Sequence, residues 1–329
     1  MKLDNIGVVG GGAWGTALAQ MVASDGSDVL LWARETDVVA AVNDTHANPI
    51  FLPNLKLSSS IRATTALSDM ADCDALLLVV PAQFLRGVLA ELPQSDRPLI
   101  LCAKGIEAGT RLLISEVAAA VAPAAPIAVV SGPTFAHEVA AGQPTAVTLA
   151  CADGGIGAAL AARLGRPTFR PYLSDDVIGA EIGGAVKNVL AIACGVVEGA
   201  GLGQNARAAL ISRGFAEMTR FGLARGARAE TLAGLSGLGD LVLTCSSTSS
   251  RNFSLGKGLG EGRSAAEMLA DRKTVAEGAS TAPVLAEAAR AVGVDMPIVD
   301  AVVTLLQGQA NVRDVVGALL ARPLRHEAK

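Results

Sequence analysis

The chain has 329 residues, enough for two domains and a sizeable buried core. Hydrophobic residues make up 51% of it and aromatic residues only 3%, and the longest charge-free run, residues 117–136, contains three prolines, which argues against a membrane span. The net charge of −4 gives no reason to expect a nucleic-acid partner.

The first predicted element is a buried strand that leads into a glycine-rich turn and a helix. The apolar run 6–9 is followed by Gly10, Gly12 and Gly15, spaced as G-x-G-x-x-G, and then by the alanine-rich segment 16–23. The first glycine allows a tight turn, the second lets the backbone approach a pyrophosphate, and the third allows close helix–strand packing. Because a strand precedes this motif and a helix follows it, we predict a dinucleotide site at the helix N-terminus.

The second predicted strand, residues 28–34, bears on the choice of cofactor. It ends at Arg34, which is followed by Glu35. An NAD-selective site usually has an acidic residue here for the ribose 2′-hydroxyl, whereas an arginine suits a 2′-phosphate. The sequence therefore favours NADPH, while Glu35 leaves NADH open. A solvated arginine at a strand end is the alternative interpretation.

Further apolar runs alternate with helical segments: residues 75–80, 98–103, 127–130 and, more weakly, 146–150 and 168–171. This alternation predicts an α/β fold with a doubly wound, Rossmann-type parallel sheet. Such sheets bind ligands beyond the carboxyl ends of their strands. The glycine loop should therefore share one edge with the segments that follow the later strands, residues 81–83, 104–107 and 131–138.

Strand-like runs disappear beyond about residue 180, where helical patterns take over. We predict a dinucleotide-binding domain over residues 1–180 and an all-helical substrate-binding and catalytic domain over residues 181–329. Lys187 lies near this junction, in an apolar helical stretch with no opposite charge within five residues. Burying an ammonium group is costly, so such a lysine is either paired through tertiary contacts or kept for chemistry. Together with the dinucleotide motif, it indicates a hydride-transfer enzyme in which Lys187 transfers the proton.

Seven sequence blocks follow one another along the chain: residues 10–19, 104–107, 131–136, 184–191, 203–213, 235–241 and 245–252. With these blocks, the chain resembles bacterial NAD(P)-dependent glycerol-3-phosphate dehydrogenases along almost its full length. The resemblance implies a reversible reduction of dihydroxyacetone phosphate to sn-glycerol 3-phosphate in the cytoplasm, which supplies glycerophospholipid synthesis.

The motif and the resemblance together imply the site residues. Lys187 is the proton donor and acceptor at the substrate oxygen. The implied substrate-binding positions are Lys104, Gly132, Thr134, Lys187, Asp240, Ser250, Arg251 and Asn252. The implied cofactor-binding positions are Gly10, Gly12, Ala13, Trp14, Gly15, Arg34, Lys104, Ala136, Arg251, Val275 and Glu277. The last two rest on residues 274–278, which match their block only loosely.

These roles fit the chemistry of ketone reduction. Negative charge develops on the ketone oxygen as hydride arrives, and a nearby ammonium group stabilises that charge and supplies the proton. Lys104 would be a second cation. Ser250, Arg251 and Asn252 offer a set of donors suited to a phosphate.

Ordinary structural roles remain open for several of these residues. Asp240 has two interpretations. It either caps a helix that starts at Leu241, or it binds Lys187 or a substrate hydroxyl. Residues 246–252 have the composition of a polar turn. The alternative role of Lys104 is a solvated lysine in a loop, and the alternative role of Trp14 is a core residue.

The remaining features concern compartment and partners. The five cysteines, Cys73, Cys102, Cys151, Cys194 and Cys245, have no C-x-x-C spacing, which indicates reduced core residues and neither a disulfide nor a metal site. The N-terminus leads straight into a strand, so we expect no signal peptide and a cytoplasmic protein. We expect a phosphorylated small-molecule substrate, no nucleic acid and no stable membrane insertion, and a homodimer is left open. The alternative function is another NADP-dependent dehydrogenase of the same architecture, acting on a hydroxy acid or sugar acid.

Overall fold

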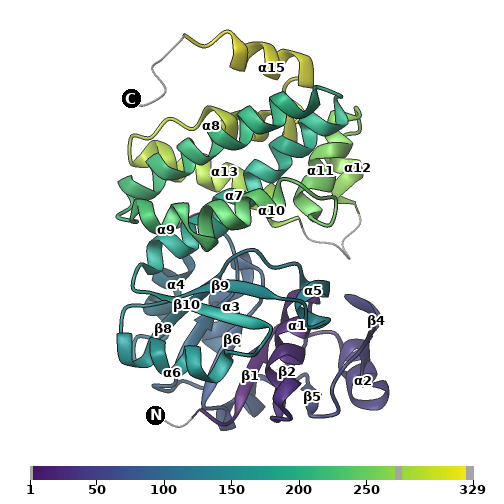
Figure 1. Cartoon of the computed structure of the whole chain (residues 1–329), viewed down its shortest axis with the longest axis vertical. Helices are drawn as coiled ribbons and strands as arrows, with labels where there is room; N and C mark the ends of the chain where they lie inside the picture. The colour runs from purple at the N-terminus through teal and green to yellow at the C-terminus, as the bar shows by residue number, and fades with distance from the viewer. Residues whose placement is uncertain (1–2, 271–275, 324–329) are drawn as a thin grey trace. The chain divides into compact units, whose positions relative to one another are not determined.

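The structure is a computed structural model that describes residues 3–270 and 276–323 (Figure 1). The chain packs into two compact units. Unit 1 comprises Met1–Ala185 and Gly222–Asp240, and unit 2 comprises Val186–Phe221 and Leu241–Lys329. We predicted a single division after residue 180. The chain instead returns to unit 1 at residues 222–240, because the turn at Leu235–Gly239 packs against strand β9 (Thr145–Cys151) and against Gly183.

Unit 1 is built on an eight-stranded sheet with the order β10-β9-β8-β7-β6-β1-β2-β5. Every neighbouring pair is parallel except β8 and β9. The predicted Rossmann-type sheet is thereby confirmed. The strands are β1 (Ile6–Val9), β2 (Val29–Trp32), β5 (Ile61–Thr64), β6 (Ala75–Leu78), β7 (Leu99–Leu101), β8 (Ile127–Ser131), β9 (Thr145–Cys151) and β10 (Phe169–Ser174).

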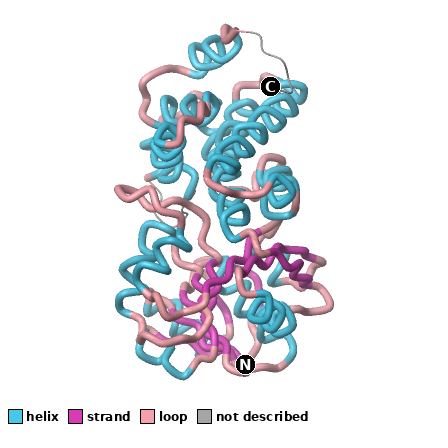
Figure 2. The backbone as a smooth tube through the Cα atoms, turned by 90° about the vertical axis from the view of Figure 1, so that its left-hand side faces the viewer, coloured by secondary structure: helices cyan, strands magenta, loops and turns pink. Residues whose placement is uncertain are grey.

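Two features of this sheet differ from the sequence prediction. Strand β5 was not predicted; it is short and lies at the edge of the sheet, beside β2. Strand β9 is antiparallel to β8 because residues 132–144, with the five-residue helix α5 (Ala136–Ala140), turn the chain back instead of crossing over the sheet. Figure 2 shows the strands in magenta, gathered in this unit.

Helices and short turns cover both faces of the sheet. Along β6, Ala75 and Leu77 join one buried apolar cluster, while Leu76 and Leu78 join the other. This strand therefore reads as a continuous apolar run, as expected for a parallel strand buried on both sides. The remaining elements of the unit are α1 (Ala13–Val22), α2 (Thr36–Thr45), the hairpin of β3 (Ala47–Asn48) and β4 (Leu52–Lys56), α3 (Leu85–Glu91), α4 (Ile114–Val121), α6 (Gly154–Leu164) and α9 (Ala229–Ala233), with short helical segments at Ala23–Asp25, Leu67–Asp72, Ala82–Phe84 and Leu235–Gly239.

The described part of unit 2 is helical, as predicted, and α7 (Val177–Gly199) runs into it from unit 1. Glycines bring α7 very close to α11 (Arg251–Gly260): a Cβ on Gly256 would lie 1.9 Å from the carbonyl oxygen of Ile192, and one on Gly195 would lie 2.0 Å from that of Phe253. The other helices are α8 (Gly203–Ala224), α10 (Asp240–Thr244), α12 (Ala265–Leu269), α13 (Glu277–Ala291), α14 (Pro297–Leu306) and α15 (Val312–Leu320).

Helix α7 is the one helix among the described residues that is long and apolar enough to cross a membrane. However, 89% of its most apolar 18-residue window is buried inside the protein. A core helix of a globular protein has the same properties, so its composition is explained by packing.

Candidate active site

The glycine loop connects β1 to α1, and its three motif glycines meet three different constraints. Gly10 has φ +128°, and a Cβ on it would lie 2.9 Å from the carbonyl carbon of Val79. A Cβ on Gly15 would lie 1.8 Å from the carbonyl oxygen of Gly10, so this glycine permits the close approach of helix and turn. A Cβ on Gly12 would meet nothing within 4 Å. The space before the N-terminus of α1 is therefore open, as a pyrophosphate requires.

Arg34 lies two residues beyond the end of β2. Its side chain is 78% exposed, and its Nη2 lies 3.3 Å from Oε1 of Glu35. Such an exposed guanidinium is accessible to a 2′-phosphate, but it is also stable when solvated by water alone. The preference for NADPH over NADH therefore stays a prediction. Trp14, next to Ala13 at the start of α1, packs partly buried against the apolar core. Its buried Nε1 has no hydrogen-bond partner among the described residues.

Lys104, which follows β7, forms a buried ion pair with Asp240. The Nζ of Lys104 lies 2.5 Å from Oδ2 of Asp240, and the two side chains are only 12% and 1% exposed. Lys104 also donates to the carbonyl oxygen of Gly132 at 3.4 Å. The solvated-lysine alternative is therefore wrong, and a cation is fixed at the carboxyl edge of the sheet.

The end of β8 completes this group in unit 1. Gly132 has φ +154°, and the hydroxyl of Thr134 donates to its carbonyl oxygen at 3.1 Å. Ser131 is 3% exposed, and its Oγ has no hydrogen-bond partner among the described residues. A Cβ on Gly184 of α7 would lie 3.1 Å from this Oγ and 3.2 Å from Cγ of Lys104. The missing side chain at Gly184 thus leaves room for the stem of Lys104.

Lys187, on α7, is buried in unit 2 with 8% of its surface exposed. Its Nζ donates a hydrogen bond of 2.8 Å to Oγ1 of Thr244, at the end of α10. This hydrogen bond to the hydroxyl of Thr244 orients the ammonium group. The sequence analysis missed Thr244. A signal was present, because Thr244 follows Asp240 by four residues, the spacing of one helical turn.

Two of the three residues predicted to bind phosphate have structural partners at the start of α11. The Oγ of Ser250 caps this helix by accepting from the N–H of Phe253 at 3.2 Å. The amide of Asn252 donates to Oδ1 of Asn188 at 3.0 Å and accepts from the N–H of Gly278 at 2.9 Å. Arg251 is exposed. The site combines the N-terminus of a ten-residue helix with one guanidinium, an arrangement that suits an anion.

The other predicted cofactor positions are spread over two helix starts. Ala136 is the first residue of α5, and Glu277 is the first residue of α13, adjacent to the Gly278 that Asn252 binds. Val275 lies outside the described residues. His137 is exposed and stacks on Phe135 with ring centroids 5.8 Å apart.

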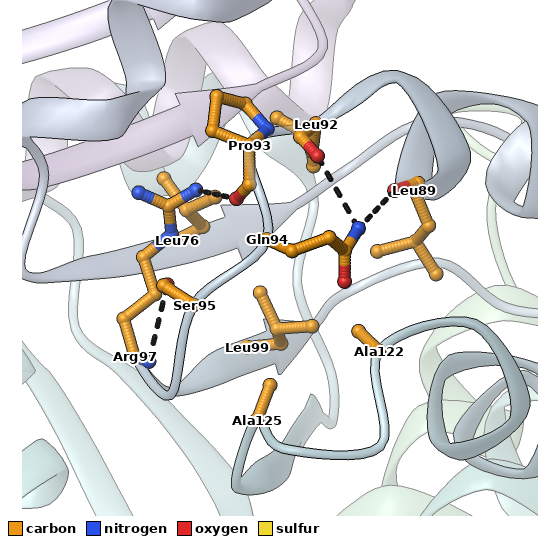
Figure 3. A pocket seen from close by; sticks show the side chains of 10 residues that line it. All are labelled: Leu76, Leu89, Leu92, Pro93, Gln94, Ser95, Arg97, Leu99, Ala122 and Ala125. Atoms are coloured by element: carbon orange, nitrogen blue, oxygen red, sulfur yellow. Dashed lines mark hydrogen bonds between the residues drawn. The ribbon is translucent and has the colours of Figure 1, made fainter.

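A small cavity in unit 1 lies away from all these residues (Figure 3). It has a volume of about 10 Å³, about enough for one water molecule. The polar side chains on its wall are occupied by the backbone: Arg97 donates to the carbonyl oxygen of Pro93, and Gln94 donates to those of Leu89 and Leu92. It is a packing defect and not a ligand site.

An open glycine loop between β1 and α1 at the turning point of a doubly wound sheet, together with a lysine buried in a helical unit, defines a nicotinamide-dinucleotide-linked dehydrogenase. Among residues 3–270 and 276–323, no group of three or more His, Cys, Asp and Glu side chains is placed to hold a metal ion. The redox chemistry of this class belongs to the dinucleotide, and the protein supplies the binding groups and the proton.

Comparison with known proteins identifies the family. Residues 5–156 match the model of the NAD-dependent glycerol-3-phosphate dehydrogenase N-terminus, and residues 176–317 match that of the C-terminus. The chain belongs to this family of oxidoreductases, and the resemblance inferred from the seven blocks is confirmed. It is 66% identical to glycerol-3-phosphate dehydrogenase [NAD(P)+] 1 of Sphingopyxis alaskensis over 99% of this chain and 98% of that protein. It is 67% identical to the enzyme of Erythrobacter litoralis over 98% of this chain and 97% of that protein.

Solved structures agree with the family assignment. The crystal structure of glycerol-3-phosphate dehydrogenase from Coxiella burnetii superposes with a TM-score of 0.92 at 38% identity, covering 97% of this chain and 99% of that one. A D-mandelate dehydrogenase with bound NADH has a TM-score of 0.63 at only 16% identity, covering 93% of this chain and 98% of that one. The latter shares the fold alone.

Proposed function

We propose that this protein catalyses the reversible NAD(P)H-dependent reduction of dihydroxyacetone phosphate to sn-glycerol 3-phosphate, in the cytoplasm and in support of glycerophospholipid synthesis. The observation that carries the proposal is the buried ammonium group of Lys187, held by the hydroxyl of Thr244 in a chain that also has an open glycine loop. The names of the relatives support the substrate and both cofactors.

The proposed proton chemistry rests on the buried Lys187. When bound, the dinucleotide would supply hydride to the substrate carbonyl carbon, so that negative charge would develop on the carbonyl oxygen. Lys187 stabilises this charge and donates its proton to the oxygen, and in the reverse direction it accepts the proton of the hydroxyl. Thr244 orients the ammonium group for this transfer. Lys104, fixed by Asp240, is the second cation of the substrate site.

The substrate phosphate is assigned to the start of α11. Arg251 is exposed there beside the helix N-terminus, whose N–H groups and dipole favour an anion. Ser250 and Asn252 fix the beginning of this helix through the hydrogen bonds that they make to Phe253, Asn188 and Gly278. We therefore assign these two residues to holding the phosphate site in shape.

The experiment follows NADPH oxidation with dihydroxyacetone phosphate, with dihydroxyacetone and with a 2-keto acid. We expect turnover of the first only, since the other two lack the phosphate. Lys187→Ala should bind NADPH normally but lose about 10²–10⁴-fold in kcat, the range for a general acid. Lys187→Arg should restore little, because a guanidinium keeps its charge but does not release a proton near neutral pH. Near-normal turnover by folded Lys187→Ala would assign the proton to another group, with Lys104 as the next candidate.

A further inference from the structure

Asn48 is a fully buried polar residue outside all the positions assigned above. It lies in β3, in the short hairpin with β4, and it has no exposed surface. Its Nδ2 donates to the carbonyl oxygen of Gly11 at 2.9 Å and to Oγ1 of Thr16 at 2.8 Å. Its Oδ1 accepts from the N–H of Phe51 at 3.1 Å. One side chain therefore links the hairpin to the middle of the glycine loop, 37 residues earlier in the sequence.

The neighbours determine the orientation of this amide. The carbonyl of Gly11 can only accept, and the N–H of Phe51 can only donate. Reversing the amide would place oxygen against oxygen and nitrogen against N–H, so one arrangement alone satisfies every partner. Thr16 is consistent with this orientation of the amide. Its hydroxyl donates to the carbonyl oxygen of Gly11 at 3.3 Å, so its oxygen is the acceptor for Nδ2 of Asn48.

The bond to Gly11 fixes the direction of a peptide group at the helix N-terminus. Among the described residues there is no cis peptide bond, so the C=O of Gly11 and the N–H of Gly12 point in opposite directions. Since Asn48 holds the carbonyl on the side of the hairpin, the N–H of Gly12 faces away from it. Gly12 immediately precedes α1 and borders open space. Glycines on both sides of this peptide would otherwise allow it to rotate easily.

We propose that Asn48 is a positioning residue of the cofactor site: it locks the Gly11–Gly12 peptide so that the N–H of Gly12 faces the pyrophosphate of the dinucleotide. The inference rests on the dinucleotide binding of the proposed function and adds a residue to it. Asn48 acts through the backbone and does not touch the ligand. Its role requires an amide, because an aspartate of the same shape has no donor for the carbonyl of Gly11 and brings a negative charge close to a site for an anion.

The test measures ligand affinity by calorimetry for wild type and Asn48→Asp. Three probes separate the parts of the cofactor. NADPH has both phosphate groups, ADP-ribose has the pyrophosphate but lacks the 2′-phosphate, and adenosine 2′-monophosphate has the 2′-phosphate but lacks the pyrophosphate. We expect Asn48→Asp to bind NADPH and ADP-ribose at least about tenfold more weakly, a factor typical of a lost hydrogen bond to a positioned group. Binding of adenosine 2′-monophosphate should change less than about twofold.

Asn43 provides the matched control in the same unit. Its amide also bridges to backbone, donating to the carbonyl oxygen of Ala63 at 3.0 Å and accepting from the N–H of Ala63 at 2.8 Å. Asn43→Asp removes a side-chain hydrogen bond between α2 and β5 that does not involve the glycine loop, at a more exposed position than that of Asn48. It should lower thermal stability and leave the affinity for all three probes unchanged.

The outcomes separate this inference from the proposed function. Wild-type affinity of Asn48→Asp for ADP-ribose, or equal losses for all three probes, would overturn the positioning role. Wild-type protein that binds neither NADPH nor ADP-ribose would overturn the proposed function itself. If Asn48→Asp does not fold, Thr16→Val replaces it, because it removes the hydroxyl shared by Asn48 and Gly11 at nearly constant volume. This variant should weaken ADP-ribose binding severalfold, and unchanged binding would again reject the role.

Discussion

Replacing Asp240 by asparagine tests the buried ion pair of the candidate site. In the native protein, Nζ of Lys104 lies 2.5 Å from Oδ2 of Asp240, and the two side chains are 12% and 1% exposed. The substitution leaves the ammonium group of Lys104 without this carboxylate where little water reaches it. Removing one partner of a buried pair costs about 3–5 kcal/mol. Because asparagine retains an acceptor oxygen, we expect a loss near the lower end, about 3 kcal/mol.

The two tryptophans of the chain allow this loss to be measured in the right unit. Trp14 and Trp32 both belong to unit 1, as do Lys104 and Asp240. Urea unfolding followed by tryptophan fluorescence therefore reports the free energy of unfolding of that unit. The double variant Lys104→Met, Asp240→Asn should lose less than the sum of the two single variants, because it leaves neither charge buried alone.

An exposed ion pair of the same unit is the control. Asp175 and Arg228 form a salt bridge whose side chains are 69% and 49% exposed. Asp175→Asn should hardly move the urea midpoint, because water replaces the lost partner. The reasoning from burial is refuted if the urea midpoint of Asp240→Asn lies as close to wild type as that of Asp175→Asn. Strictly additive losses in the double variant would refute it as well.

Three further predictions concern the cofactor, pH and packing. Arg34→Ala should weaken NADPH binding far more than NADH binding, measured by calorimetry, and equal losses would show that Arg34 does not contact the 2′-phosphate. Burial raises the pKa of Glu181 from 4.5 to about 7, so the native state holds a proton that the unfolded state releases, and the urea midpoint of unit 1 should fall as pH rises from 4.5 to 7. Glu181→Gln should flatten this dependence, and an unchanged slope would remove Glu181 as its cause. Gly256→Ala should destabilise unit 2 by at least about 1–3 kcal/mol, because its Cβ would lie 1.9 Å from the carbonyl oxygen of Ile192. Gly317→Ala in α15 meets no neighbour within 4 Å and should stabilise its helix slightly, as followed by circular dichroism.

Where the signal was local, the sequence predicted the structure closely. Strand β1 has the predicted bounds, Ile6–Val9, and the glycine loop follows it as expected. The apolar runs of β6, β7 and β8 were found to within two residues at each end. Such runs are readable because a parallel strand covered on both faces must be apolar throughout. Strand β5 was missed because in Ile61–Thr64 buried residues alternate with more exposed ones at the edge of the sheet.

The candidate residues were predicted one at a time, and their pairing was not. The sequence marked Lys104 and Asp240 separately, but they are 136 positions apart, and Asp240 was weighed as a partner of Lys187 or as a helix cap. Thr244, 57 residues from Lys187, was not considered. No local pattern connects residues so far apart, because their distance depends on how whole helices and strands pack.

The sequence by itself determined the fold class, the dinucleotide loop, the helical second half and the family. Each of these rests on residue types at short, fixed spacings, which the geometry of strands, turns and helices dictates directly. Only the tertiary structure decided that Lys104 pairs with Asp240, that Lys187 donates to Thr244, and that Asn48 donates to the carbonyl oxygen of Gly11. These contacts depend on which polar groups meet when the helices and strands pack. Each contact is specific because a buried polar group without a hydrogen-bond partner would cost free energy.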